Sequence, residues 1–122
     1  MRIMLIDDEP STCQLVETIL KMQGYDVTVT YDGEEALNLL QTETSLPDLI
    51  ILDVMLPKLS GYDVAERIKA DERLQTIPVI LFSAKSRREI EQKVKEIGLA
   101  GFILKPFAIE DFERVISANL NT

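Results

Sequence analysis

Polar side chains that could carry chemistry stand directly after four apolar runs of the sequence. They are Asp7, Asp8, Asp53, Ser83 and Lys105. Carboxylates bind hard cations such as Mg²⁺, and a carboxylate can also attack phosphorus to give an aspartyl phosphate. A lysine and a hydroxyl can bind phosphoryl oxygens, and phosphoryl transfer needs little more than such positioning and charge stabilisation. Brought together, these residue types would support transfer of a phosphoryl group to a carboxylate.

The elements that must position these residues follow from the alternation of apolar runs with helical patterns. The apolar runs predict strands at 2–6, 26–30, 48–52, 78–82 and 101–104, and apolar residues at helical spacing predict helices at 10–23, 33–44, 62–70, 87–97 and 109–120. The first, third and fourth runs are continuously apolar, which is typical of strands covered on both faces. The pattern predicts an α/β fold with a doubly wound, five-stranded parallel sheet flanked by five helices.

In a fold of this class, the crevice beyond the carboxyl ends of the strands is where ligands bind. We therefore expect Asp7, Asp8 and Asp53 to lie together there, with Ser83 and Lys105 beside them. Carboxylates repel one another: at about 4 Å and an effective dielectric constant near 20, each pair costs about 4 kcal/mol. A divalent cation such as Mg²⁺ removes this objection, so the pattern predicts a cation site that also receives a phosphoryl group, with Asp53 as the nucleophile.

Each of these residues also has a purely structural interpretation. Asp8 or Glu9 could cap the helix that begins at residue 10. Asp53 could open a turn, Ser83 could cap the helix that follows it, and Lys105 could be a solvated surface lysine. Their joint occurrence at one edge of the predicted sheet favours the functional interpretation, because a structural site would not gather like charges.

The composition predicts one domain over residues 1–122, with 46% hydrophobic residues to form its core. The net charge of −8 argues against direct binding to nucleic acid or to anionic membranes. No apolar run approaches the roughly 20 residues of a membrane span. The sequence contains no histidine, which excludes Ser-His-Asp catalysis, His-ligated zinc and a phosphohistidine in this chain.

The single cysteine, Cys13, excludes an internal disulfide and is expected to be a small buried residue. The lack of disulfides and of an export signal predicts a cytoplasmic location. The sequence ends at Thr122, just after the last predicted helix, so that no output domain follows within it. A stand-alone regulator and the receiver part of a longer protein both agree with this length.

Over essentially all of its residues, the sequence resembles the receiver domain of two-component response regulators. The resemblance rests on the acidic pair Asp7–Asp8, on IILDVMLPKLSG around Asp53, on LFSAKS around Ser83 and on ILKPF around Lys105. It implies the flavodoxin-like receiver fold. It also implies a signalling phosphoacceptor in phosphorelay signal transduction, with no enzymatic activity beyond its own phosphorylation and dephosphorylation.

The resemblance assigns a role to each residue of the predicted site. Asp53 would be the phosphoacceptor, and Mg²⁺ would be held by the side chains of Asp8 and Asp53, by Asp7 nearby or through water, and by the backbone carbonyl of Met55. The residues that contact the phosphoryl oxygens would be Ser83 and Lys105, and the bond from Lys105 to Pro106 would be cis. The phosphoryl donor would be a phosphohistidine of a sensor histidine kinase or of a histidine phosphotransfer protein.

The resemblance also implies a switch and an output surface. Ser83 would move toward the phosphoryl group, and Phe102 would rotate into the space that it leaves. The readout would be the face formed by the fourth helix, the fifth strand and the fifth helix, where an output partner or effector domain would bind. Phe102 has a structural interpretation as well, as an ordinary core residue.

The sequence departs from the family at positions that bear on output. Many DNA-binding regulators have an acidic pair before the switch aromatic, where this chain has Leu99–Ala100–Gly101, and Arg114 is the only basic residue on its last helix. The sequence does not exclude a homodimer on phosphorylation, but these differences argue against the dimer typical of those regulators. Met55 and Lys85 occupy positions that influence the lifetime of the aspartyl phosphate in the family.

The predicted fourth helix and the residues before it are locally basic. Five of the 13 basic residues fall between Lys85 and Lys95. With three glutamates interleaved, this pattern agrees with a solvated helix face, and it also agrees with a contact surface for an acidic partner.

Three other functions agree less well with the sequence than a phosphoreceiver does. A haloacid-dehalogenase-like phosphatase also uses an aspartyl nucleophile and Mg²⁺, but it normally has a second acid two residues later, where this chain has Met55. A protein-interaction module of the same fold would not need the intact acidic residues, Ser83 and Lys105. A nucleotide-binding fold is disfavoured because no glycine-rich phosphate loop follows the first strand.

Overall fold

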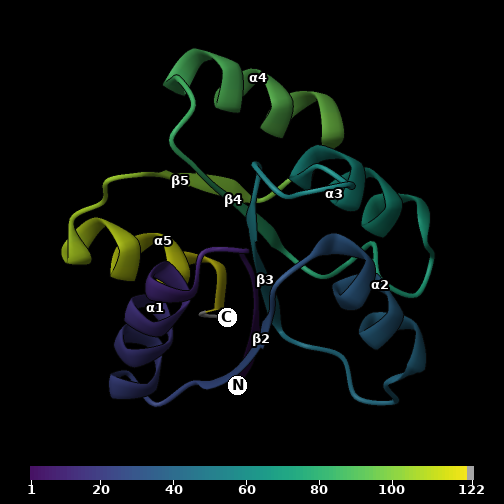
Figure 1. Ribbon diagram of the computed structural model, residues 1–122, viewed down its shortest axis with the longest axis horizontal. Coiled ribbons are helices and arrows are strands. Elements are labelled where there is room, and N and C mark those ends of the chain that lie inside the picture. The colour runs from purple at the N-terminus through teal and green to yellow at the C-terminus, as the bar shows by residue number, and fades with distance from the viewer. Residues whose placement is uncertain (121–122) are drawn as a thin grey trace.

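The computed structural model describes residues 1–120 and shows one five-stranded sheet with helices on both faces (Figure 1). The strands are β1 (Arg2–Ile6), β2 (Asp26–Thr30), β3 (Leu49–Asp53), β4 (Val79–Ser83) and β5 (Gly101–Leu104). The helices are α1 (Pro10–Met22), α2 (Gly33–Thr42), α3 (Gly61–Ala70), α4 (Arg87–Ile97) and α5 (Ile109–Leu120). All neighbouring strands are parallel and follow the order β2-β1-β3-β4-β5. The predicted fold class is therefore confirmed.

The predicted elements are all present, and their ends differ by a few residues. β4 begins at Val79 because Pro78 has no N–H to donate to the sheet; its carbonyl still accepts from Ile50 N at 3.0 Å. α3 begins at Gly61, one residue earlier than predicted, because Ser60 and Asp63 form a reciprocal capping box. β3 extends through Asp53, so that the predicted nucleophile belongs to the strand itself.

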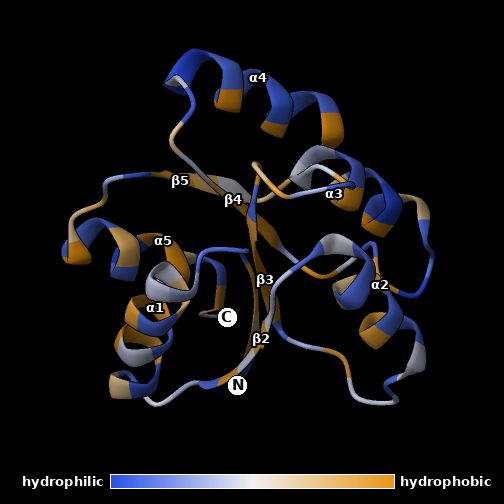
Figure 2. Cartoon of the chain, viewed as in Figure 1, coloured by the Kyte–Doolittle hydropathy of each residue, from blue (hydrophilic) through white to orange (hydrophobic). Residues whose placement is uncertain are grey.

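The core has two halves, one on each face of the sheet. The half under α1 and α5 contains Cys13, Val16 and Phe112, and the half under α2, α3 and α4 contains Leu40, Val64, Ala65 and Ile90. Alternate residues of the central strands point into each half, and Figure 2 shows hydrophobic residues along the strands and on the inner sides of the helices. Burial on both faces explains why β1, β3 and β4 are continuously apolar in sequence.

Polar residues cap the starts of the first four helices. The caps are Glu9 for α1, Asp32 for α2, Ser60 for α3 and Ser86 for α4. Ser86 holds the capping position of α4, so the structural interpretation of Ser83 as that cap is wrong. None of the helices within residues 1–120 has the length and apolar character needed to cross a membrane.

Candidate functional site

The ends of four strands bring the predicted site residues to one edge of the sheet. Asp7 follows β1, Asp53 ends β3, Ser83 ends β4 and Lys105 follows β5. β3 lies between β1 and β4, and β5 flanks β4, so the four ends are adjacent. One carboxylate oxygen from each of Asp7, Asp8 and Asp53 lies within 4.8 Å of the others. The predicted gathering of the three aspartates is therefore observed. We use the name acidic rim for Asp7, Asp8, Asp53 and Lys105.

Within the acidic rim, Lys105 contacts two of the three carboxylates. Its Nζ lies 3.0 Å from Asp7 Oδ2 and 3.5 Å from Asp53 Oδ2. The ammonium also lies 4.4 Å from the centroid of the Phe82 ring, in cation–π contact. The alternative of a solvated surface lysine is therefore wrong. The bond from Lys105 to Pro106 is cis, as the resemblance implies.

The acidic rim has more negative than positive charge, and most of it is buried. Asp7 is fully buried and Asp53 is 5% exposed, whereas Asp8 is exposed. Burial and, secondly, the neighbouring Asp7 carboxylate raise the pKa of Asp53 to about 6, although Lys105 opposes the shift. One ammonium does not compensate three carboxylates, and this imbalance would be relieved by a bound cation.

The donor atoms of the acidic rim fit Mg²⁺, which prefers oxygen ligands from one or two carboxylates together with water and phosphate. Asp7 Oδ1 accepts the Glu9 N–H at 2.9 Å and Asp53 Oδ1 accepts the Met55 N–H at 3.1 Å. These hydrogen bonds fix both carboxylates while their Oδ2 atoms point toward Lys105. The Asp53 bond also confirms the predicted turn, so that the structural and chemical interpretations of Asp53 are compatible.

Ser83 is fully buried at the end of β4. Its Oγ accepts the Lys85 N–H at 3.0 Å, and its carbonyl accepts the Lys105 N–H at 2.8 Å. Among residues 1–120, no acceptor is found for the hydroxyl proton of Ser83. That proton is available for an oxygen that arrives at the neighbouring acidic rim.

Cys13 lies beneath the acidic rim as a small buried residue, as predicted. Its Sγ donates to the backbone carbonyl of Asp7 at 3.2 Å. Burial, followed by the charge of Asp7, raises the pKa of the thiol to about 11. Cys13 therefore stays protonated and supports the segment that carries Asp7.

Phe102 is partly buried and packs at the margin of the core half under α4. The Arg87 guanidinium lies 5.3 Å from the centroid of its ring. Phe102, Arg87 and Arg114 all line an open hollow of about 740 Å³ between α4, β5 and α5. Its incomplete burial distinguishes Phe102 from an ordinary core residue, and its role in a switch stays a prediction.

The sequence did not predict the structural roles of two residues near Asp53. Gly61 lies against the backbone of Asp53: a Cβ at Gly61 would come within 2.1 Å of the Asp53 carbonyl oxygen, and Gly61 N donates to Val54 O at 2.9 Å. Lys58 adopts a left-handed backbone with φ of 65°, which turns the loop back toward the strand. The Pro-Lys-Leu-Ser-Gly sequence signals a loop, but it does not show that the loop folds back onto Asp53.

Comparisons with known proteins agree with this geometry. The family model described as "Response regulator receiver domain" matches residues 3–117. The chain is 40% identical over 113 residues to the DNA-binding dual master transcriptional regulator RpaA of Synechocystis, covering 90% of this chain and 45% of that protein. It is 32% identical over 118 residues to the polar-differentiation response regulator DivK of Brucella ovis, covering 97% and 94%. The chain thus spans about half the length of the curated transcriptional regulators that it matches, and nearly all of DivK.

Among solved structures, the chain resembles the receiver domain of a sensor histidine kinase from Pseudomonas aeruginosa. The two are 26% identical, with a TM-score of 0.87 and coverage of 99% of this chain and 98% of the other. That structure has a magnesium ion coordinated in its active site cleft.

Proposed function

The chain belongs to the family of response regulator receiver domains, and on this premise we propose that it accepts a phosphoryl group on Asp53. The donor would be a phosphohistidine of a sensor histidine kinase or of a histidine phosphotransfer protein, since the chain has no histidine of its own. The observation that carries the proposal is the convergence of Asp53 with Asp7, Asp8 and Lys105 in one partly buried, negatively charged rim.

The acidic rim supports attack by Asp53 on the phosphorus atom. With a pKa of about 6, Asp53 is mostly ionised at neutral pH and can act as a nucleophile. A bond forms between an Asp53 carboxylate oxygen and phosphorus, the phosphorus–nitrogen bond of the donor breaks, and its electron pair returns to the imidazole. Mg²⁺, held by Asp7, Asp8, Asp53 and the Met55 carbonyl, would neutralise the surplus charge and bind a phosphoryl oxygen.

Lys105 and Ser83 would bind the other phosphoryl oxygens. Lys105 already lies between the two buried carboxylates, and the Ser83 hydroxyl has a proton to donate. The phosphoryl group adds about −1.5 to −2 charges at this point. We propose that Ser83 shifts toward it and that Phe102 follows.

The output would be a change in protein binding at the face formed by α4, β5 and α5. The hollow of about 740 Å³ on this face is bordered by Phe102 and Arg87, which links it to the proposed switch. We propose that an output partner or effector domain binds here in the cytoplasm, and that a homodimer formed on phosphorylation would use the same face. The net charge of −8 disfavours direct contact of this chain with nucleic acid.

The proposal is tested by exposing the protein to acetyl phosphate and Mg²⁺, and separately to beryllium fluoride as a phosphoryl mimic. The wild type is expected to gain the mass of one phosphoryl group and to bind the mimic, whereas Asp53→Asn does neither. Asp26→Asn, at an exposed aspartate of β2, is the matched control and should behave as the wild type.

Each other outcome has a clear meaning. A wild type that neither gains mass nor binds the mimic would contradict the proposal and favour an interaction module that does not use phosphate. Repeated turnover of small phosphoesters would instead favour the haloacid-dehalogenase-like phosphatase.

A further inference from the structure

A second cation, Lys85, lies near the acidic rim and pairs with Glu89. Lys85 lies two residues after Ser83, and its backbone N–H donates to Ser83 Oγ at 3.0 Å. Lys85 borders a hollow of about 480 Å³ that is also bordered by Asp8, Met55 and Tyr62. Lys85 and Asp8, the exposed carboxylate of the rim, therefore border the same space.

Glu89, on the first turn of α4, is the group that holds the Lys85 ammonium. Its Oε2 lies 3.7 Å from Lys85 Nζ and accepts the Tyr62 hydroxyl proton at 2.7 Å. Tyr62 itself lies under Lys93, whose Nζ is 5.0 Å from the ring centroid. Burial and the Glu89 carboxylate raise the pKa of Tyr62 above its usual value, so that the phenol remains a donor. Tyr62 thus fixes Glu89 between α3 and α4.

The two contacts of Glu89 differ in strength. The hydrogen bond from Tyr62 is short and partly buried, whereas Lys85 and Glu89 have side chains that are 35% and 43% exposed. Ion pairs of such exposure contribute little, because water screens them and because two long side chains must be ordered. Lys85 can therefore leave Glu89 at small cost when a stronger anion appears, while Glu89 stays in place.

We propose that Glu89 is a positioning residue for the phosphoacceptor site, and that it acts by holding the Lys85 ammonium away from the acidic rim until a phosphoryl group is bound. This inference rests on the proposed function. A phosphoryl group carries nearly two negative charges and outcompetes the single charge of Glu89 for Lys85. Because the Lys85 backbone is bonded to Ser83 Oγ, a movement of Ser83 toward the phosphoryl group also carries Lys85 toward it.

The test is a double-mutant cycle on the affinity for beryllium fluoride in the presence of saturating Mg²⁺. Glu89→Gln keeps an acceptor for Tyr62 but removes the charge that holds Lys85, so we expect binding about threefold tighter. Lys85→Gln removes the second cation, so we expect binding about threefold weaker. In the Lys85→Gln background, the effect of Glu89→Gln should disappear, because Glu89 acts through Lys85.

Glu91→Gln is the matched control for the change in net charge. Glu91 lies on the same helix, but it pairs with Arg87 at 3.4 Å and does not border the hollow. It should leave the affinity for the mimic unchanged. In wild type, the NMR signal of the Lys85 ammonium should also shift when the mimic binds, and an unchanged signal would contradict the inference.

The outcomes separate this inference from the proposed function. If the wild type binds no mimic, both the proposed function and the positioning role of Glu89 are wrong. If the wild type binds it and Glu89→Gln has the same effect with and without Lys85, or if Glu91→Gln reproduces that effect, only the positioning role of Glu89 is overturned.

Discussion

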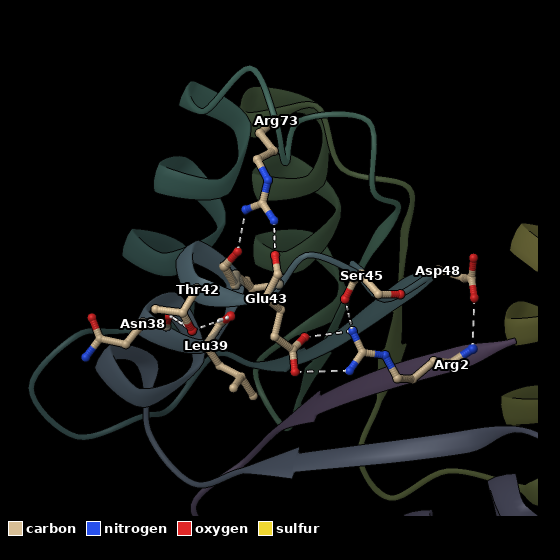
Figure 3. A network of polar contacts seen from close by, with 9 residues as sticks. Arg2, Asn38, Leu39, Thr42, Glu43, Ser45, Asp48 and Arg73 are labelled. Atoms are coloured by element: carbon tan, nitrogen blue, oxygen red, sulfur yellow. Dashed lines mark hydrogen bonds and ion pairs between the residues drawn. The ribbon is translucent and has the colours of Figure 1, made fainter.

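The two edges of the sheet differ in how well their charged side chains are balanced by partners of opposite charge. At the amino edge, where the strands begin, the Arg2 guanidinium binds Glu43 through two hydrogen bonds of 3.2 and 2.7 Å and also donates to Ser45 O (Figure 3). The Arg2 backbone N–H donates to Asp48 at 2.8 Å. Arg73 donates to the carbonyls of Leu40 and Glu43, which the end of α2 leaves without helical partners. Each charged group here has a partner of opposite polarity.

At the carboxyl edge, by contrast, the acidic rim gathers three aspartates around the single ammonium of Lys105. The pKa values report the difference. The hydrogen bond from Arg2 lowers the pKa of Glu43, whereas burial and Asp7 raise that of Asp53 to about 6. A balanced cluster stabilises the fold, and an unbalanced one lowers its stability unless a ligand supplies the missing charge. Charge balance thus distinguishes the cluster at the amino edge, which stabilises the fold, from the acidic rim, which is suited to bind a ligand.

The largest expected effect concerns packing at the two edges. Gly61→Ala would place a Cβ within 2.1 Å of the Asp53 carbonyl oxygen, so the loop or the strand end must shift. We expect a loss of about 2–3 kcal/mol in the free energy of unfolding, measured by urea denaturation, together with weaker binding of the phosphoryl mimic. Gly101→Ala is the control at the amino edge, because its Cβ would make only an ordinary contact of 3.5 Å with Ile80. Equal losses for the two variants would contradict the tight approach at Asp53.

The second prediction tests the imbalance directly. Without Mg²⁺ at pH 7, Asp53→Asn should raise the free energy of unfolding by about 1–2 kcal/mol, because it removes a buried like charge and leaves Lys105 paired with Asp7. Mg²⁺ should stabilise the wild type and reduce the difference in the free energy of unfolding between the two proteins. Asp26→Asn, at an exposed position, should show no such gain. A destabilised Asp53→Asn protein would mean that the acidic rim is balanced after all.

The third prediction follows from the raised pKa of Asp53. The carboxyl titrates near 3.8 in the unfolded chain and at about 6 in the folded one. Between these values the folded protein retains a proton that the unfolded chain has released, so raising the pH through this window lowers the stability of the wild type. The gain in the free energy of unfolding that Asp53→Asn brings should therefore grow by about 2 kcal/mol from about pH 4 to about pH 6 and stay level above it. Urea titrations of both proteins across this range measure the difference in their free energies of unfolding. A difference independent of pH would contradict the raised pKa of Asp53.

The sequence predicted the fold and the acidic rim for different physical reasons. Continuous apolar runs such as 49–52 specify strands buried on both faces, and parallel strands bring their carboxyl ends to one edge, so that Asp7, Asp53 and Lys105 had to meet. The contacts of Gly61, Glu89 and Arg73 were not predicted, because they join loops and helices whose relative positions depend on the packing of the whole chain. Periodicity specifies which face of an element is buried, but not which side chain lies opposite.

The smallest expected effect comes from the balanced edge. Glu43→Gln keeps an acceptor for Arg2 but removes the charge, and since this pair is partly exposed we expect a loss of only about 0.5 kcal/mol in the free energy of unfolding at pH 7. The lowered pKa of Glu43 means that its contribution is present above the usual glutamate value of 4.5 and is lost as the pH falls below it. The loss should also shrink in high salt. Glu66→Gln, at an exposed position of α3, serves as the control in the same urea titrations. A gain in stability for Glu43→Gln, like that expected for Asp53→Asn, would show that charge balance does not distinguish the two edges.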